Sequence, residues 1–234
     1  MNVITDNIIE YKANHQATGV FVGREHAGKI LAGMLESYQG SDAIVLGIPA
    51  GGMPVAAVVA SELKLELNFI VVKKVTPPDN TEFGYGAIAA DGSLRINENL
   101  PPRLGLSESE VQHGITIARN KVQQRERMFR QHLPTTRLQG RDVILVDDGL
   151  ATGVTYQTAI DSLHKQGVNS IIGAIPTAHQ QSLTQMAQQL DRIYCANVRA
   201  GLRYAVAEAY EQWHDVSDEE VIALLRQTRQ AAHA

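Results

Sequence analysis

The sequence predicts an α/β fold, with a parallel-sheet core and helices on both faces. Its 234 residues are 44% hydrophobic, which suits one sizeable domain. Several short runs are continuously apolar, such as VILV at 143–146. These runs alternate with segments whose apolar residues recur at helical spacing. Strands that are apolar throughout and alternate with helices are typical of a parallel sheet covered on both sides.

The first half of the chain supplies two strand and helix alternations. Arg24–Tyr38 is predicted to be a helix because its apolar residues are three and four positions apart. Asp42–Ile48 (DAIVLGI) is expected as a strand, and Gly52–Leu63 as a helix with an alanine and valine face. Leu67–Lys74 (LNFIVVKK) is predicted to be the next strand.

The middle of the chain is less regular. Residues 75–94 are rich in proline and glycine and are expected to be irregular, with a hairpin turn at Asp91–Gly92. A long helix is predicted for Ser107–Gln131, with Ser107 as its N-cap and Glu110 completing a capping box. Its arginines alternate with Gln and Glu, so we interpret them as a solvated face rather than a nucleic-acid surface.

The alternation resumes in the second half. The predicted elements are strand Asp142–Val146, helix Gly153–Gln166 closed by Gly167, strand Ser170–Pro176, helix His179–Leu190, strand Asp191–Cys195 and helix Ser217–Gln230. We expect a single domain over 1–234, with a core at about 20–195 and a terminal helix or hood at about 196–234. The role of residues 1–20 stays open.

Composition narrows the class of protein. A net charge of -4 argues against a nucleic-acid binder held by a strongly basic surface. Cys195 is the single cysteine and follows apolar neighbours, so we interpret it as a core residue of a protein from a reducing compartment.

The opening MNVITDNIIEYK lacks the pattern of a signal peptide. Proline and glycine interrupt the uncharged stretch Ala43–Ala60, which argues against a membrane span. A cytoplasmic protein is expected.

The segment VILVDDGLATGVT, Val143–Thr155, places two carboxylates directly after a buried strand. Ligands of open parallel sheets bind at the carboxyl ends of the strands, where Asp147 and Asp148 are expected. The loop that follows leads into a helix, and its free N–H groups suit a phosphate. Carboxylates accept hydrogen bonds from sugar hydroxyls and can hold magnesium. A ribose 5-phosphate would satisfy both the acids and the loop.

A purely structural role for the acidic pair agrees less well with the sequence than a functional role. As capping or surface acids, Asp147 and Asp148 would need exposure to water, because adjacent buried carboxylates repel each other and lose hydration. Their place behind four apolar residues does not suit such exposure. We therefore expect the pair to be functional.

Val143–Thr155 resembles the phosphoribosyl pyrophosphate (PRPP) signature of type I phosphoribosyltransferases: four apolar residues, two acids, then a small-residue loop with TG and a final Thr. GIPAGGMPVA (47–56) lies where that family places its pyrophosphate loop, and VVKK (71–74) where it has a basic residue. EFGYGAIAADG (82–92) lies where a mobile catalytic loop is usual. With FVGREHAGKILA and WHDVSDEEV, the chain most resembles a bacterial group known as predicted phosphoribosyltransferases, over most of residues 20–225.

The resemblance implies an enzyme that transfers ribose 5-phosphate from PRPP to a nitrogenous acceptor, with Mg²⁺ and release of pyrophosphate. The residues that it assigns to catalysis are Asp147, Asp148, Lys73 and Lys74, of which the two acids would hold the metal indirectly, through PRPP or water. Its PRPP-binding residues would be Ala50, Gly51, Gly52, Gly149, Ala151, Thr152, Gly153, Val154 and Thr155. Because neighbours on a strand point to opposite sides, we expect one of the two lysines to reach the pyrophosphate. Tyr85, Tyr210 and Trp213 are weaker candidates for contact with a flat acceptor, and we favour packing for the terminal aromatics.

Two positions depart from the family pattern. Related groups often carry a basic residue where this chain has Ala50, so pyrophosphate would depend on the lysines and magnesium. Members that act on 6-oxopurines usually carry an Asp where this chain has Ala151, which argues against a hypoxanthine or guanine enzyme. The identity of the acceptor and the formation of a homodimer stay open.

Other interpretations remain beside the enzyme. A PRPP- or nucleotide-sensing module on the same fold is the main alternative, and an amine or phosphorylated acceptor is a further one. GREHAGK (23–29) matches most of a phosphate-binding Walker A loop, but Ile30 stands where the magnesium-binding hydroxyl would be, and an amphipathic helix explains the segment better. A phospho-receiver domain would need a third Asp after a later strand, whereas Asp191 opens one. The eight histidines lack metal-ligand spacing.

Overall fold

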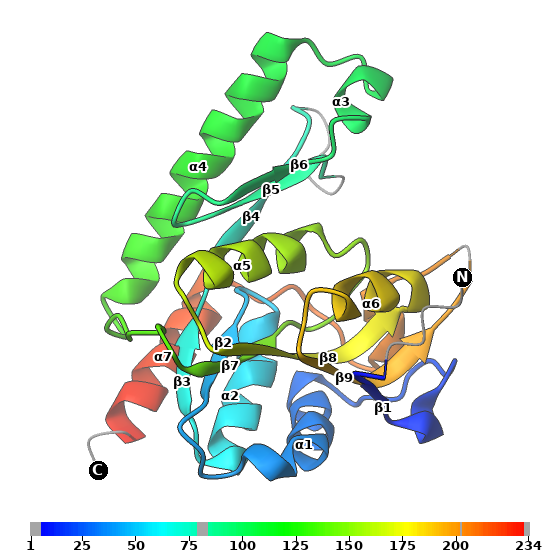
Figure 1. Ribbon diagram of the computed structural model, residues 1–234, viewed down its shortest axis with the longest axis vertical. Helices are drawn as coiled ribbons and strands as arrows, with labels where there is room; N and C mark the ends of the chain where they lie inside the picture. Colours follow the sequence, from blue (N-terminus) through cyan, green and yellow to red (C-terminus); the bar gives the residue numbers. More distant parts are fainter. Residues whose placement is uncertain (1–5, 79–83, 202, 232–234) are drawn as a thin grey trace.

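The computed structural model describes residues 6–78, 84–201 and 203–231. Its main sheet has six strands, and every neighbouring pair is parallel (Figure 1). The strands lie in the order β1 (Ile8–Glu10), β9 (Arg192–Arg199), β8 (Ser170–His179), β7 (Asp142–Val146), β2 (Ile44–Gly47) and β3 (Glu66–Phe69). The predicted parallel-sheet core is therefore confirmed.

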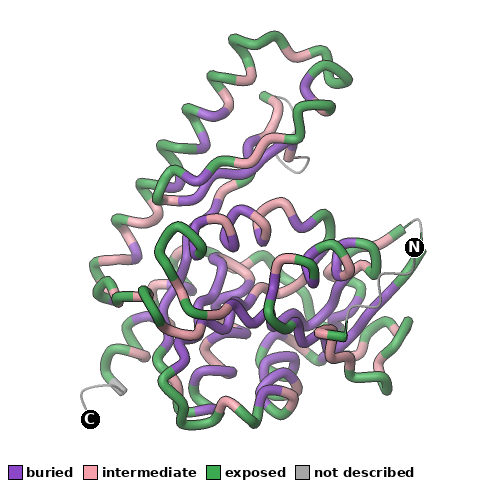
Figure 2. Tube along the Cα trace, in the orientation of Figure 1, coloured by how far each residue is buried: buried purple, intermediate pink, exposed green. Residues whose placement is uncertain are grey.

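Helices cover both faces of this sheet, as predicted. On one face pack α1 (Arg24–Met34) and α2 (Gly52–Leu63), and on the other pack α5 (Val154–Lys165) and α6 (Gln180–Ala187). Alternate residues of β7 serve the two layers, and all four of its apolar residues are buried (Figure 2). Cys195 is fully buried in β9, where burial raises the pKa of its thiol to about 12, so its interpretation as a core residue is confirmed.

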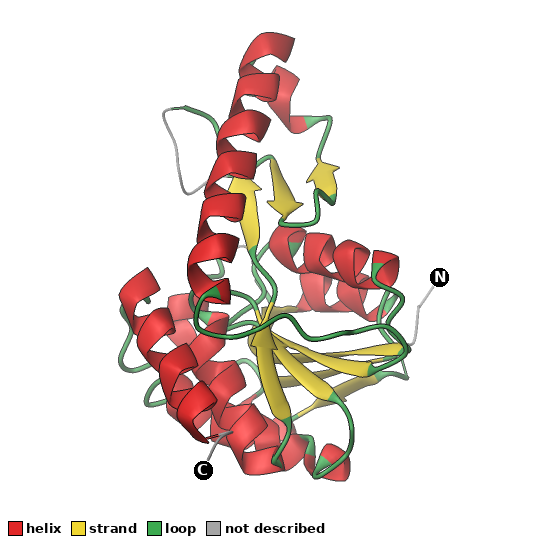
Figure 3. Cartoon of the chain, turned by 90° about the vertical axis from the view of Figure 1, so that its left-hand side faces the viewer, coloured by secondary structure: helices red, strands yellow, loops and turns green. Residues whose placement is uncertain are grey.

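A second, antiparallel sheet forms an arm that projects from the core (Figures 1 and 3). It consists of β4 (Val72–Val75), β5 (Gly86–Ala89) and β6 (Leu94–Ile96), followed by α3 (Leu100–Arg103) and α4 (Glu108–Arg130). The hairpin turn at Asp91–Gly92 is confirmed, with Gly92 at φ +88°. The expectation of an irregular segment over 75–94 was wrong in part, because β5 is a buried strand. Residues 79–83 of that segment lie outside the described residues.

The predicted strand Leu67–Lys74 is in fact two strands in two sheets. The Ile70 N–H still bonds to Gly47 O of the main sheet at 3.1 Å, whereas Val71 O accepts from Ala90 N of the arm at 3.1 Å. The backbone thus changes its hydrogen-bonding partner between Ile70 and Val71. Because both halves are mostly buried, the apolar run continues across the junction and hides the break.

Both predicted capping boxes are confirmed. Ser107 Oγ accepts from the Glu110 N–H at 3.3 Å, and Glu110 Oε2 accepts from the Ser107 N–H at 2.8 Å. Ser217 and Glu220 repeat this arrangement ahead of α7 (Asp218–Ala231). Strand β8 runs beyond the predicted end at Pro176, because residues 177–179 pair with residues 197–199 of β9. Leu150 also bonds to Thr177 O and to the His179 N–H. Strand β9 likewise continues past Cys195 to Arg199.

A segment near the start of the sequence pairs with one that follows β9. Residues 205–216, which we call the strap, include the 3₁₀-helix η3 (Val206–Ala209), and backbone hydrogen bonds join residues 208–212 to residues 19–22. Two further 3₁₀-helices, η1 (Lys12–Asn14) and η2 (Glu36–Tyr38), lie nearer the N-terminus, so the predicted helix 24–38 is divided at Leu35. In the described part of the chain, none of the helices is long and apolar enough to cross a membrane.

Candidate functional site

The acidic pair and the glycine turn after β2 meet at the carboxyl edge of the main sheet. Asp147 and Asp148 follow β7 directly, and β2 lies beside β7 in the sheet. A Cβ atom added to Gly51 would lie 1.9 Å from Asp148 Oδ2, and one added to Gly52 would lie 2.8 Å from Val146 O. The two loops are therefore so close that a side chain at either glycine would displace one of them.

The loop after the acidic pair is fixed to β8 and opens α5. The Leu150 N–H donates to Thr177 O at 2.8 Å, and the Ser182 hydroxyl donates to Ala151 O. Gly153 has φ +79°, a left-handed conformation that favours glycine at this turn into the helix. The first N–H groups of a helix lack partners within it. Thr152 is exposed and Thr155 half-buried, so their hydroxyls flank a set of N–H groups suited to an anion.

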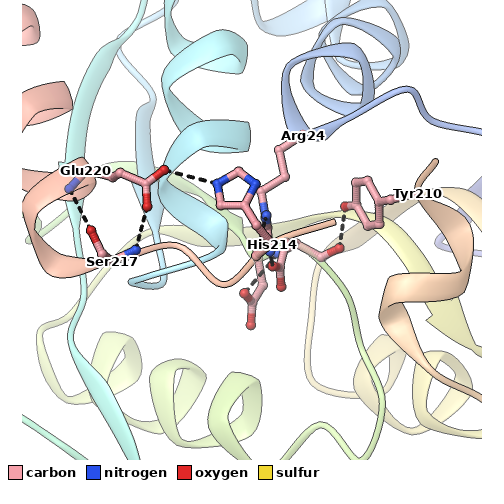
Figure 4. Close-up of polar contacts among 7 residues, drawn as sticks. Arg24, Tyr210, His214, Ser217 and Glu220 are labelled. Carbon is pink, nitrogen blue, oxygen red and sulfur yellow. Dashed lines mark hydrogen bonds and ion pairs between the residues drawn. The ribbon is translucent and has the colours of Figure 1, made fainter. Parts of the chain in front are cut away.

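The two carboxyl groups, both half-buried, have different environments. Asp148 Oδ2 accepts two hydrogen bonds from Arg24, from Nε at 3.0 Å and Nη2 at 2.8 Å (Figure 4). Asp147 Oδ1 instead accepts the N–H of Asp148 at 2.9 Å. Burial, and then the negative charge of Asp148, raise the pKa of Asp147 well above its ordinary value, while Lys74 acts in the opposite direction. Asp148 thus has a cationic partner in contact, whereas a negative charge on Asp147 is destabilised.

Arg24 was not recognised as a site residue from the sequence. It is the first residue of α1, in the segment that was weighed as a Walker A loop. Gly28 of that segment faces α2 instead, where an added Cβ would lie 2.7 Å from Val58 Cβ. The segment is therefore a helix packed on a helix, as the apolar spacing indicated. Nothing in the sequence pattern links Arg24 to an acid 124 residues away.

Lys73 and Lys74 lie on β4 of the arm rather than on a strand of the main sheet. Burial, and then the positive charges of Arg125 and Lys121, lower the pKa of Lys73. Lys73 therefore lies toward α4. Lys74 is exposed, and its charge acts on Asp147. Of the two lysines, Lys74 is the one whose charge reaches the acidic pair.

The three aromatic candidates differ in position. Tyr85 is 1% exposed and its hydroxyl lies 3.4 Å from Val111 O, so it packs beneath α4 and is not brought to the acidic pair. Tyr210 is buried, and its hydroxyl donates to Asp148 O at 2.6 Å. Trp213 is 37% exposed, and the Arg24 guanidinium lies 4.1 Å from the centre of its ring. The two strap aromatics thus pack around the Arg24 and Asp148 pair.

A family model described as the phosphoribosyl transferase domain matches residues 23–197, which include the glycine turn and the acidic pair. The chain belongs to the phosphoribosyltransferase family. Over 206 residues it is 32% identical to two Mycobacterium tuberculosis proteins, from strains CDC 1551 and H37Rv, whose names assign them provisionally as phosphoribosyl transferases. The match covers 88% of the chain, which spans only 46% of the length of those relatives.

A solved structure has the same fold as this chain. The crystal structure of TT1426 from Thermus thermophilus superposes with a TM-score of 0.72 at 32% identity, over 88% of this chain and 98% of that one. In this chain the carboxyl edge of the parallel sheet carries the acidic pair. A cavity of about 910 Å³ also exists, but it lies at the amino end of β3, among residues of α2, α4 and α7, away from that edge.

The side chains at this edge of the sheet limit how a metal ion would bind there. Among residues 6–78, 84–201 and 203–231, no three His, Cys, Asp or Glu side chains group in a way that could hold a metal ion. Mg²⁺ usually keeps several waters and takes one or two carboxylates together with substrate phosphates. Asp147 and Asp148 fit that mode of binding, which needs no further protein ligand.

Proposed function

We propose that this phosphoribosyltransferase transfers the ribose 5-phosphate of PRPP to a nitrogenous acceptor and releases pyrophosphate. The observation that carries the proposal is the contact between the Gly51–Gly52 turn and the acidic pair. A PRPP molecule presents a 5-phosphate, ribose hydroxyls and a pyrophosphate in that order. The 151–155 loop, the two carboxyl groups and the glycine turn offer a complementary set of groups along one edge of the sheet.

In this proposal each group has a separate task. The N–H groups of residues 151–155 and the Thr152 and Thr155 hydroxyls bind the 5-phosphate. The carboxylates of Asp147 and Asp148 accept hydrogen bonds from the ribose hydroxyls. The N–H groups at Gly51 and Gly52, together with Lys74, orient the pyrophosphate. Catalysis then comes from positioning and charge stabilisation as the C1–O bond breaks, the C1–N bond forms and the acceptor nitrogen loses its proton.

Magnesium would supply charge compensation on the pyrophosphate when it is bound with PRPP. The residues suited to hold it are Asp147 and Asp148, directly or through water. Ala50 adds no positive charge to the glycine turn, so Lys74 is the protein cation that we assign to this end of the ligand.

The proposal is tested by phosphorus NMR of the protein with Mg²⁺ and PRPP, alone and with pooled nucleobases and amines. Pyrophosphate that appears only with acceptors would support a transferase, and division of the pool would identify the acceptor. Signals that broaden without turnover, and sharpen in Asp147→Ala and Asp148→Ala variants, would favour the PRPP-sensing module. The absence of both broadening and turnover would contradict both functions.

The two lysines provide a matched pair for a prediction about pyrophosphate. Lys74→Ala is expected to raise the KM for PRPP about tenfold or more, because it removes a charged hydrogen-bond donor from the leaving group. Lys73→Ala is expected to leave KM close to that of the unaltered protein, since Lys73 lies toward α4. The measurement is steady-state kinetics of both variants once the acceptor is known, or calorimetric titration with Mg-PRPP. Equal effects of the two substitutions would contradict the assignment of Lys74.

A further inference from the structure

Arg24 has three kinds of contact at the carboxyl edge (Figure 4). Its Nε and Nη2 atoms both donate to Oδ2 of Asp148. Its Nη1 donates to the backbone oxygen of His214 in the strap at 2.9 Å. Its guanidinium stacks on Trp213, with the Tyr210 ring 5.9 Å away. The side chain is only 7% exposed, so α1, the acidic pair and the strap together determine its position.

The two oxygens of the Asp148 carboxyl group have different contacts. Arg24 occupies Oδ2 with both hydrogen bonds. Oδ2 is also the oxygen nearer the glycine turn, 1.9 Å from where a Cβ of Gly51 would be, whereas Oδ1 is 3.1 Å from that point. Oδ1 accepts no hydrogen bond from the described residues. The two hydrogen bonds from Arg24 fix the orientation of this carboxyl group and leave its other oxygen to accept a further hydrogen bond. Without Arg24, the side chain could rotate, and a second unpaired negative charge would adjoin Asp147.

We propose that Arg24 is a positioning residue, which fixes the Asp148 carboxylate so that its second oxygen accepts a hydroxyl of the bound ribose. The inference rests on the proposed function, because it assumes that the site binds a ribose 5-phosphate. It adds a specific role for α1 and the strap. Arg24 joins both to the acid that touches the sugar, and it does not itself touch the ligand.

An arginine beside the edge strand β3 is a suitable control. Arg130 of α4 also donates through Nε and Nη2 to one carboxylate oxygen, that of Glu126, at 3.0 and 2.7 Å. Its Nη1 likewise donates to a backbone oxygen, that of Pro134, at 3.2 Å, and its guanidinium lies 4.0 Å from the centre of the Phe69 ring. Arg130 therefore has similar kinds of contact, at 25% exposure of its side chain, but is not in contact with the acidic pair.

The experiment is calorimetric titration with ribose 5-phosphate and with inorganic phosphate, which share a phosphate but differ in the sugar. The unaltered protein is expected to bind ribose 5-phosphate more tightly than phosphate. Arg24→Gln is expected to reduce that preference about tenfold, the effect of losing one hydrogen bond to a charged group. Affinity for phosphate alone should not change. Arg130→Gln should retain both affinities.

Two further variants keep the test decisive if Arg24→Gln unfolds. Arg24→Lys keeps the charge but cannot donate through two nitrogens to Oδ2, and Trp213→Leu keeps the ion pair but removes the stacked ring. Both should lose part of the preference while thermal unfolding shows a folded protein. A folded Arg24 variant with an unchanged preference would overturn the role of Arg24 alone. An unaltered protein that does not prefer ribose 5-phosphate to phosphate would instead overturn the proposed function.

Discussion

Replacing Asp147 with Asn is expected to stabilise the folded protein at neutral pH and to weaken its binding of PRPP. Burial and the neighbouring Asp148 raise the pKa of Asp147, so the folded state disfavours its negative charge. Asn keeps the size of the side chain and an oxygen that can accept the Asp148 N–H. We expect a gain of about 1–3 kcal/mol in the free energy of unfolding, which is the size of the desolvation cost of a polar group.

The pH dependence of this gain has a definite sign. Because the pKa of Asp147 is higher in the folded than in the unfolded chain, its contribution to stability is fully present below the unfolded value, about 3.9. That contribution is lost as the pH rises through the raised folded pKa. The Asn variant does not titrate at this position, so its advantage should be largest at neutral pH and vanish below about pH 4.

Urea unfolding of both proteins between pH 4 and 8 measures the effect on stability, and titration with Mg-PRPP measures the effect on binding. A loss of about 10- to 100-fold in affinity is expected, since a neutral amide is a poorer acceptor for a sugar hydroxyl than a carboxylate. Asp142→Asn is a suitable control, because Asp142 stands at the opposite end of the same strand. An Asp147→Asn protein that is less stable at neutral pH would contradict the electrostatic explanation.

Gly51→Ala is expected to remove most of the activity with a smaller effect on stability. The added methyl group would lie 1.9 Å from Asp148 Oδ2, so the glycine turn, the carboxylate or both must move. A displacement of about 1 Å in a catalytic site can reduce the rate about 100-fold. We expect a loss of that size in kcat/KM, with a destabilisation of about 1–3 kcal/mol from overpacking.

Gly33→Ala is the matched control for this substitution. Gly33 is an exposed residue of α1, and no atom lies within 4 Å of an added Cβ. It is expected to retain activity and to gain up to about 1 kcal/mol in stability, because alanine favours helix over glycine. Kinetics and thermal unfolding of both variants provide the comparison. Full activity of Gly51→Ala would show that the two loops are not held as closely as the structure has them.

The strands and helices of the core were predictable because their signals are local. The residues of VILV at 143–146 and of the capping boxes at Ser107 and Ser217 are enough to predict their local structure. All three predictions are confirmed. The division of LNFIVVKK was not predictable, since its cause is the change of hydrogen-bonding partner beyond Ile70. Strand β1 was missed because it has three half-buried residues and owes its existence to pairing with β9.

The same distinction applies to the candidate site. The acidic pair and the glycine turn each carry a recognisable pattern, and the topology of a parallel sheet brings them to one edge. Arg24 has no such pattern, because its place at the site depends on contacts with residues more than a hundred positions away. The different directions of the Lys73 and Lys74 side chains could not be assigned without the position of α4.

The pairing of residues 208–212 with residues 19–22 has a consequence for how the protein is made. Synthesis proceeds from the N-terminus, and domains begin to fold in that direction. Every strand of the parallel sheet, through Arg199 of β9, leaves the ribosome before Tyr210 and the His214 carbonyl. The nascent chain can therefore complete its sheet while Arg24 still lacks its strap contacts, and the acidic pair is enclosed only after residues 205–216 have been synthesised.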